Sequence, residues 1–203
     1  MREIVVRAIP SVDPLHCLFQ QPVRSADKKH GTRVAIRTWI MAHPTRLRSF
    51  EYVGYWRYLA TTCAYKRRPL FREASIVTSS LDQILQASVR EKCEVLAYCF
   101  MPDHVHLLIA GEDGEADFER FMKLAKQRAG WRHSQDTGHR LWQPGYHERV
   151  LRADEATPDV IRYMVANPVQ AGLVTKPEDY PYWGSATHSR GEILEFIATV
   201  RQT

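Results

Sequence analysis

Runs of apolar residues predict four elements in the middle of the chain. Residues 55–63 are aromatic and β-branched, which is typical of a strand. Apolar side chains recur at helical spacing over 76–91, so we expect a helix there. The almost continuously apolar run 93–100 predicts a central strand, and 104–110 predicts another strand after a Met-Pro-Asp turn. The last two runs together indicate a β-hairpin.

The next part of the chain predicts another helix and a short strand. Over residues 116–131 the apolar side chains fall on one arc of a helix and the cations on the other, which indicates an amphipathic helix. We expect residues 132–141 to form a loop. Residues 147–151 are expected to form a short strand.

A third helix is expected to begin at Thr157. Thr157 followed by Pro158 matches an N-cap and a proline at the first helical position. This helix should run to about Ala166, because Pro168 disfavours helical backbone in the residue before it. The order of elements is strand, helix, strand, strand, helix, strand, helix. It indicates an α+β fold, in which helices pack on an antiparallel sheet.

Charge is unevenly distributed along the 203 residues. Residues 1–68 contain 13 Lys and Arg but 4 Asp and Glu, whereas residues 69–203 contain 15 and 19. A basic segment favours a polyanionic partner such as nucleic acid, although a merely solvated basic arm is the alternative. Residues 1–48 contain four prolines and show no sustained period, so we expect a poorly ordered N-terminal extension.

Composition excludes several classes of protein. No apolar run approaches the roughly 18 residues of a membrane helix, and the first residues lack the apolar segment of a secretory signal. We therefore expect a cytoplasmic protein that does not contact membranes. The four cysteines, at positions 17, 63, 93 and 99, form no C-x-x-C pair. Their spacing favours free thiols over a zinc site or a disulfide framework.

Two histidines at alternate positions are a candidate metal site. His104 and His106 belong to the strand expected over 104–110, so both imidazoles point to the same face and could share one divalent ion. The pattern alone is weak, and two histidines on a half-exposed strand face are the alternative. Its place beside a turn, at the end of a central strand, favours a functional site.

Tyr163 and Asn167 are a second candidate pair. Their spacing of four residues places them on one face of the helix expected from Thr157. Near a metal ion, the amide oxygen could be a ligand and the phenol could act as a nucleophile. On these residues alone, a core tyrosine and an asparagine near a helix end are the better interpretation.

The helix expected over 116–131 and the segment after it combine cations with aromatic side chains. Such a combination is typical of proteins that bind single-stranded nucleic acid, although a solvated helix face with ordinary core aromatics is the alternative. The candidate DNA-binding residues are Arg120, Lys123, Lys126, Arg128, Arg132, Trp142 and Tyr146.

Four segments occur together in an order that resembles one family. They are FMPDHVHLLIAG (100–111), LWQPGYHERVL (141–151), VIRYMVANPVQAGLV (160–174) and YPYWGS (180–185). In combination they resemble the REP-associated tyrosine transposases, which are single-tyrosine members of the HUH endonuclease superfamily. The resemblance covers about residues 45–186. It implies a ferredoxin-like antiparallel sheet, a transposase domain over 49–186 and a C-terminal tail or helix over 187–203.

The resemblance also implies roles for individual residues. His104 and His106 match the family's metal-binding pair, Tyr163 matches its catalytic tyrosine, and Asn167 matches a residue that completes the metal site. The cofactor would be Mg²⁺ or Mn²⁺. The substrate would be single-stranded or hairpin DNA, cut and rejoined through a 5′-phosphotyrosine intermediate by a monomer or a homodimer.

Two departures from the family pattern and three competing functions stay open. About 45 N-terminal residues have no recognised counterpart, and Gln170 stands where relatives often carry arginine. The main alternative function is a DNA hairpin-binding protein without catalysis. A replication initiator or relaxase of the same superfamily is disfavoured by the short chain, and a metalloenzyme unrelated to nucleic acid would show no salt-dependent DNA binding.

Overall fold

Five antiparallel strands form one sheet, in the order β4-β1-β3-β2-β5, in a computed structural model that describes residues 50–151 and 157–199. The strands are β1 (Arg57–Cys63), β2 (Cys93–Met101), β3 (His104–Gly111), β4 (His147–Val150) and β5 (Trp183–Gly184). The helices are α2 (Ala74–Arg90), α3 (Phe118–Thr137), α4 (Thr157–Gln170) and α5 (Arg190–Thr199). Short 3₁₀ helices are η2 (Tyr65–Arg67), η3 (Leu70–Arg72) and η4 (Pro177–Asp179).

This topology confirms the predicted fold class. The elements from β1 to β4 follow the order βαββαβ, and their strands lie in the order β4-β1-β3-β2, as in ferredoxin-like folds. β5 adds a short strand at the β2 edge. The strands and the hairpin predicted from the apolar pattern are all present, as is the helix that became α2.

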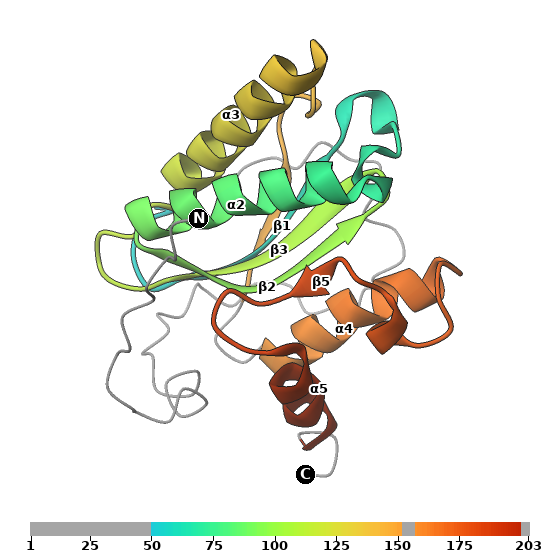
Figure 1. The fold of residues 1–203 in the computed structure, drawn as a ribbon. Coiled ribbons are helices and arrows are strands. Elements are labelled where there is room, and N and C mark those ends of the chain that lie inside the picture. Colours follow the sequence, from blue (N-terminus) through green and yellow to red (C-terminus); the bar gives the residue numbers. More distant parts are fainter. Residues whose placement is uncertain (1–49, 152–156, 200–203) are drawn as a thin grey trace, which may run out of the picture.

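The sheet is covered by helices on both faces, which explains why β2 and β3 are apolar almost throughout (Figure 1). Alternate residues of β3 belong to different cores. Val105, Leu107 and Ile109 pack in the core cluster under α2 and α3. Leu108 and Ala110 pack in the cluster under α4 and α5. The same alternation places His104 and His106 on the α4 side of the sheet.

Helix α3 is longer than the sequence pattern predicts. The prediction of a loop over 132–141 is wrong for residues 132–137, which continue the helix. His133 is buried in this extension, and residues 131–137 contain neither glycine nor proline. Gly138 has a φ of 72°, the left-handed conformation that commonly ends helices, and its N–H donates to the Ser134 carbonyl at 2.8 Å.

Helix α4 also continues past its predicted end. It extends through Pro168 to Gln170, so the prediction that Pro168 ends it is wrong. Proline cannot donate to the carbonyl four residues earlier, which here belongs to Met164. The side-chain amide of Asn167 donates to that carbonyl at 3.4 Å and thereby replaces part of the lost bond.

The start of α4 is tied to the sheet. Thr157, expected to precede the helix as its cap, lies in the first turn. Its hydroxyl accepts a hydrogen bond from the Arg57 guanidinium of β1. This bond joins the N-terminal end of α4 to the central sheet. Tyr163 lies further along the same helix.

The predicted extension over 1–48 lies outside the described residues. Within the described ranges no helix is long and apolar enough to cross a membrane. Cys63, Cys93 and Cys99 are buried and free. Helix α5, in the segment predicted as a C-terminal tail or helix, shares the core cluster of α4.

Candidate active site

The two histidines of β3 converge on one point. The Nε2 atoms of His104 and His106 lie 3.1 Å apart, and their ring planes are nearly perpendicular. Across the sheet, His104 is paired with Cys63 of β1 and His106 with Thr61. His104 opens β3 directly after the hairpin turn, so the pair lies at that end of the sheet.

Each imidazole is held by a partner on its other nitrogen. His104 Nδ1 lies 2.7 Å from an Asp103 carboxylate oxygen, and His106 Nδ1 lies 2.9 Å from the Thr61 hydroxyl. Partners of this kind fix the orientation of metal-binding histidines and direct the second nitrogen toward the ion. Arg67 in turn contacts Asp103, with Nε 2.8 Å from the other carboxylate oxygen.

The surroundings of both histidines favour the neutral imidazole. Burial lowers the pKa of His104, and the hydrogen bond to Asp103 opposes that shift in part. Burial lowers the pKa of His106 to about 3, and the charges of His104 and Arg67 add to this effect. Metal ligation requires neutral imidazole, so the site favours the state that can bind a cation.

One proton assignment satisfies this chain of contacts without a metal ion. His104 Nδ1–H donates to Asp103, His106 Nε2–H donates to His104 Nε2, and the Thr61 hydroxyl donates to His106 Nδ1. Because a hydroxyl can also accept, Thr61 can take the proton of the other His106 tautomer. Both Nε2 lone pairs are then available to one ion.

Tyr163 meets this pair from the opposite side of the α4–sheet interface. It lies in the middle of α4, half-buried, with its ring centroid 6.3 Å from that of His106 and the ring planes at 65°. Helix α4 packs on β2 and β3, so its position relative to the histidines is set by the core around Met164 and Leu108. The structure thus brings together a phenol and two imidazoles from distant parts of the sequence.

Asn167 lies one turn after Tyr163, as its spacing predicts. Its Nδ2 donates to the Tyr163 carbonyl at 3.0 Å and to the Met164 carbonyl at 3.4 Å. The amide nitrogen is therefore occupied by the helix, which leaves the amide oxygen for any ligand. Within the described chain, no contact joins Asn167 to His104 or His106.

The pair of Nε2 atoms fits a divalent ion. An octahedral ion with bonds of about 2.0–2.1 Å places neighbouring ligand atoms about 2.9 Å apart, close to the 3.1 Å seen here. The described ranges contain no group of three or more His, Cys, Asp or Glu that could hold a metal. Water, a DNA phosphate or the Asn167 oxygen would have to supply the remaining ligands.

The cations predicted to bind DNA lie on α3, in the helix layer on the other face of the sheet. They are Arg120, Lys123, Lys126, Arg128 and Arg132. Most of them already contact other groups of the chain. Arg120 pairs with Glu91 at 3.3 Å, and Arg132 pairs with Asp136 at 3.1 Å. Arg128 donates to Gln83 and Gln86 of α2.

Lys126 holds the segment that follows α3. Its ammonium donates to the carbonyls of Gln143 and Gly145, and burial lowers its pKa to about 8. Trp142 and Tyr146 are partly buried at the α2–α3 core. For all seven of these candidates, a role in DNA binding stays a prediction, and the structure does not group them with the histidines.

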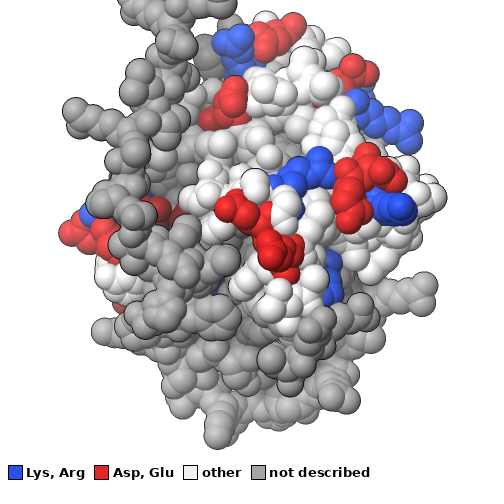
Figure 2. All heavy atoms as spheres, turned by 60° about the horizontal axis from the view of Figure 1, so that its bottom comes forward, with Lys and Arg blue, Asp and Glu red and all other residues white. Residues whose placement is uncertain are grey.

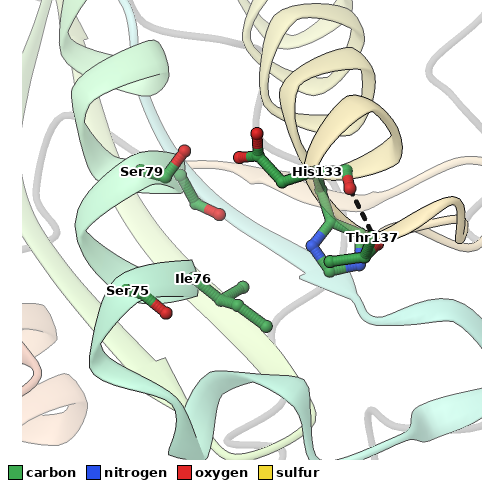
Figure 3. Close-up of a pocket in the computed structure, with 7 residues that line it drawn as sticks. Ser75, Ile76, Ser79, His133 and Thr137 are labelled. Carbon is green, nitrogen blue, oxygen red and sulfur yellow. Dashed lines mark hydrogen bonds between the residues drawn. The ribbon is translucent and has the colours of Figure 1, made fainter.

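A small pocket lies between α2 and α3, also away from the histidine pair (Figure 3). It is lined by serines of α2 and by His133, Asp136 and Thr137 of α3. The Thr137 hydroxyl donates to the His133 carbonyl at 2.7 Å. We call His104, His106 and Tyr163 the histidine–tyrosine cluster. None of these three residues lines the pocket.

Asp103, Thr61 and Arg67 are functional candidates that the sequence patterns do not predict. Asp103 carried a visible signal, because a carboxylate directly before a candidate metal-binding histidine is a common partner for its second nitrogen. No feature of the sequence indicated a role for Thr61 or Arg67. Their relation to the histidines depends on the register between β1 and β3 and on the turn after β1.

Known proteins match the part of the chain that contains this site. The family model described as transposase, IS200-like, matches residues 53–167, which include both histidines, Tyr163 and Asn167. A REP-associated tyrosine transposase of Escherichia coli K12 is 25% identical over 116 residues, 55% of this chain and 68% of that protein. A putative REP-associated tyrosine transposase of Haemophilus influenzae is 24% identical over 132 residues, 55% of this chain and 72% of that protein.

A solved structure has a similar fold. It is a REP-associated tyrosine transposase bound to a REP hairpin, with a TM-score of 0.55 and 21% sequence identity. The match covers 69% of this chain and 82% of that one.

Proposed function

Because the chain belongs to the IS200-like transposase family, an enzyme family of tyrosine transposases, we propose that it cuts and rejoins single-stranded DNA with Tyr163 as the nucleophile. The observation that carries this proposal is the approach of the Tyr163 ring to His106, whose Nε2 converges with that of His104. A nucleophile beside a preformed cation site is the arrangement that phosphoryl transfer requires.

The proposed step conserves atoms and charge. The Tyr163 oxygen attacks the scissile phosphorus as the bond from phosphorus to the 3′ oxygen breaks. The phenol loses its proton, and the departing 3′ oxygen gains one. The products are a 5′-phosphotyrosine and a free 3′ hydroxyl. Because the phosphodiester is replaced by another ester, a second 3′ hydroxyl can reverse the step and join a new strand.

The proposed cofactor is Mg²⁺ or Mn²⁺, held by His104 and His106, with the Asn167 oxygen as a further candidate ligand. When bound, such an ion polarises the scissile phosphate as a Lewis acid. The chain's own contribution is to keep both imidazoles neutral, oriented by Asp103 and Thr61, and largely shielded from water.

The proposed substrate is a DNA hairpin, since one solved relative was bound to a REP hairpin. Cations and aromatic residues on and after α3 remain candidates for contacts with its paired stem. Among the cations, Lys123 is exposed and makes no hydrogen bond or ion pair with any residue in the described ranges.

A nicking assay tests the proposal. Labelled single-stranded hairpins from the DNA flanking the gene are incubated with wild type, Y163F and the control Y55F, with Mn²⁺ or with EDTA. Tyr55 is exposed and lies outside the cluster, so Y55F makes the same chemical change elsewhere. We expect a covalent adduct on denaturing gels for wild type and Y55F with Mn²⁺, and none for Y163F. Tight hairpin binding without any adduct would favour the non-catalytic alternative.

A further inference from the structure

We propose that the connection between β1 and α2 forms a second DNA contact surface, which binds the phosphate backbone of the single strand beside the histidine–tyrosine cluster. This inference rests on the proposed function and identifies a surface that the cations of α3 do not include. We call the surface the basic rim. Its residues are Lys66, Arg68, Arg72 and Arg140.

The rim is attached directly to the turn that carries His104. The Ala64 N–H donates to the Asp103 carbonyl at 2.9 Å, and the Phe71 N–H donates to the Pro102 carbonyl at 2.9 Å. Between these two bonds, Arg67 pairs with the Asp103 carboxylate, which holds His104. The chain from 64 to 71 is therefore fixed to the β2–β3 turn on both sides of η2.

The rim cations are available to a ligand. Lys66, Arg68, Arg72 and Arg140 are exposed and form no ion pair with any residue in 50–151 or 157–199. Lys66 and Arg140 lie near the Tyr65 ring, at 5.5 and 5.8 Å from its centroid. Three rim cations thus lie within seven positions along the chain, and Arg140 joins them from the loop after α3.

Among the described residues, neither α3 nor the side that carries α4 and α5 has this combination. Four of the five α3 cations contact groups of the chain itself, as described above. On the side that carries α4 and α5, the described residues in view show acidic and basic side chains mixed together (Figure 2). A run of unpaired cations beside a candidate catalytic cluster is the feature that tracks a polyanion.

The backbone of the segment that carries the rim has a defined conformation. Lys66 and Arg67 have φ values of 55° and 54°, in the left-handed region that non-glycine residues rarely adopt. The Tyr65 N–H donates to the Leu141 carbonyl at 2.8 Å, which joins the rim to the loop that carries Arg140.

The test measures how salt weakens binding of an unstructured oligonucleotide. Fluorescence anisotropy gives Kd between 0.1 and 1 M KCl for wild type, R68Q/R72Q and the control R90Q. Arg90 is an exposed arginine at the far end of α2, about 25 Å from the start of that helix. Each lost phosphate contact lowers the slope of log K against log salt by about 0.7.

We expect R68Q/R72Q to lose about 1.4 from that slope, which corresponds to a Kd raised about 25-fold at 0.1 M KCl and nearly unchanged at 1 M. R90Q should keep the wild-type slope. Thermal unfolding of all three proteins establishes that the substitutions leave the fold intact.

Two results would overturn the inference in distinguishable ways. If R68Q/R72Q and R90Q have the same slope while wild type still forms the adduct, the rim does not bind DNA and the proposed function stands. That result would favour an acidic protein as the partner of this surface. If wild type neither binds a single strand nor forms an adduct, the proposed function fails together with the rim.

Discussion

Tyr163 and His106 face each other across the interface between α4 and the sheet, with ring centroids 6.3 Å apart. They are separated by 57 positions in the sequence and come from different elements. The contact depends on the core that packs α4 against β2 and β3. Substitutions that reposition α4 should therefore impair the reaction even when they leave every candidate catalytic side chain in place.

Asp103 should determine metal affinity through His104. D103A removes the acceptor for His104 Nδ1–H, so we expect Mn²⁺ affinity to fall about 10- to 100-fold. D103N retains an acceptor oxygen and should lose less. The control D82N removes an exposed carboxylate from α2 and should bind Mn²⁺ as wild type does. Electron paramagnetic resonance titration of free Mn²⁺ measures all four proteins without DNA. Equal affinities for D103A and wild type would contradict the positioning role.

Thr61 should act on His106 in the same way. T61V cannot accept the Nδ1 proton of the metal-binding tautomer, whereas T61S keeps the hydroxyl. We expect T61V to weaken Mn²⁺ binding and T61S to restore it. A T61S protein as weak as T61V would indicate that the methyl group, and not the hydroxyl, matters here.

The buried histidines should make stability depend on pH in the absence of metal. The folded-state pKa values of His104 and His106 lie below the ordinary 6.5, that of His106 at about 3. The unfolded chain therefore binds more protons as the pH falls below 6.5, for His106 down to about pH 3. The free energy of unfolding should therefore decrease as pH falls through this window, by up to about 1.4 kcal/mol per pH unit for each histidine. Urea unfolding in EDTA at pH 7, 6 and 5 measures the slope. H106Q should show a shallower slope than wild type.

Asn167 and Pro168 should be energetically coupled. N167A leaves the carbonyls of Tyr163 and Met164 without the side-chain donor, at a cost of about 1–2 kcal/mol. P168A restores a backbone N–H for Met164, so N167A should cost less in that background. A double-mutant cycle on the free energy of unfolding tests this coupling. Additive effects would show that the amide does not compensate for the proline.

Local patterns were sufficient to predict most of the elements and the histidine pair. The period of two in β3 places His104 and His106 on one face, and the period of 3.6 in α4 places Tyr163 and Asn167 together. These periods do not show that the histidine pair and the Tyr163–Asn167 pair lie near each other. Their relative position depends on how α4 packs on the sheet. The family resemblance supplied that link.

The errors have equally local causes. Pro168 predicted a helix end, but the Asn167 side chain compensates for the missing N–H and α4 continues. The loop predicted from residue 132 is wrong up to Thr137, because α3 continues to that residue. The DNA-binding role of the α3 cations stays a prediction, but Glu91 and two glutamines of α2 contact several of them. Such pairings join residues far apart in the chain, so a single sequence read along one helix does not reveal them.

The most direct test of the central claim identifies the amino acid that becomes attached to DNA. Wild-type protein is incubated with a hairpin substrate and Mn²⁺, the DNA is digested to a short nucleotide remnant, and the peptides are analysed by tandem mass spectrometry. We predict a 5′-phosphodiester on Tyr163 alone, and no modified peptide from Y163F under the same conditions. A remnant attached to another tyrosine, or an adduct that persists in Y163F, would contradict the assignment of Tyr163 as the nucleophile.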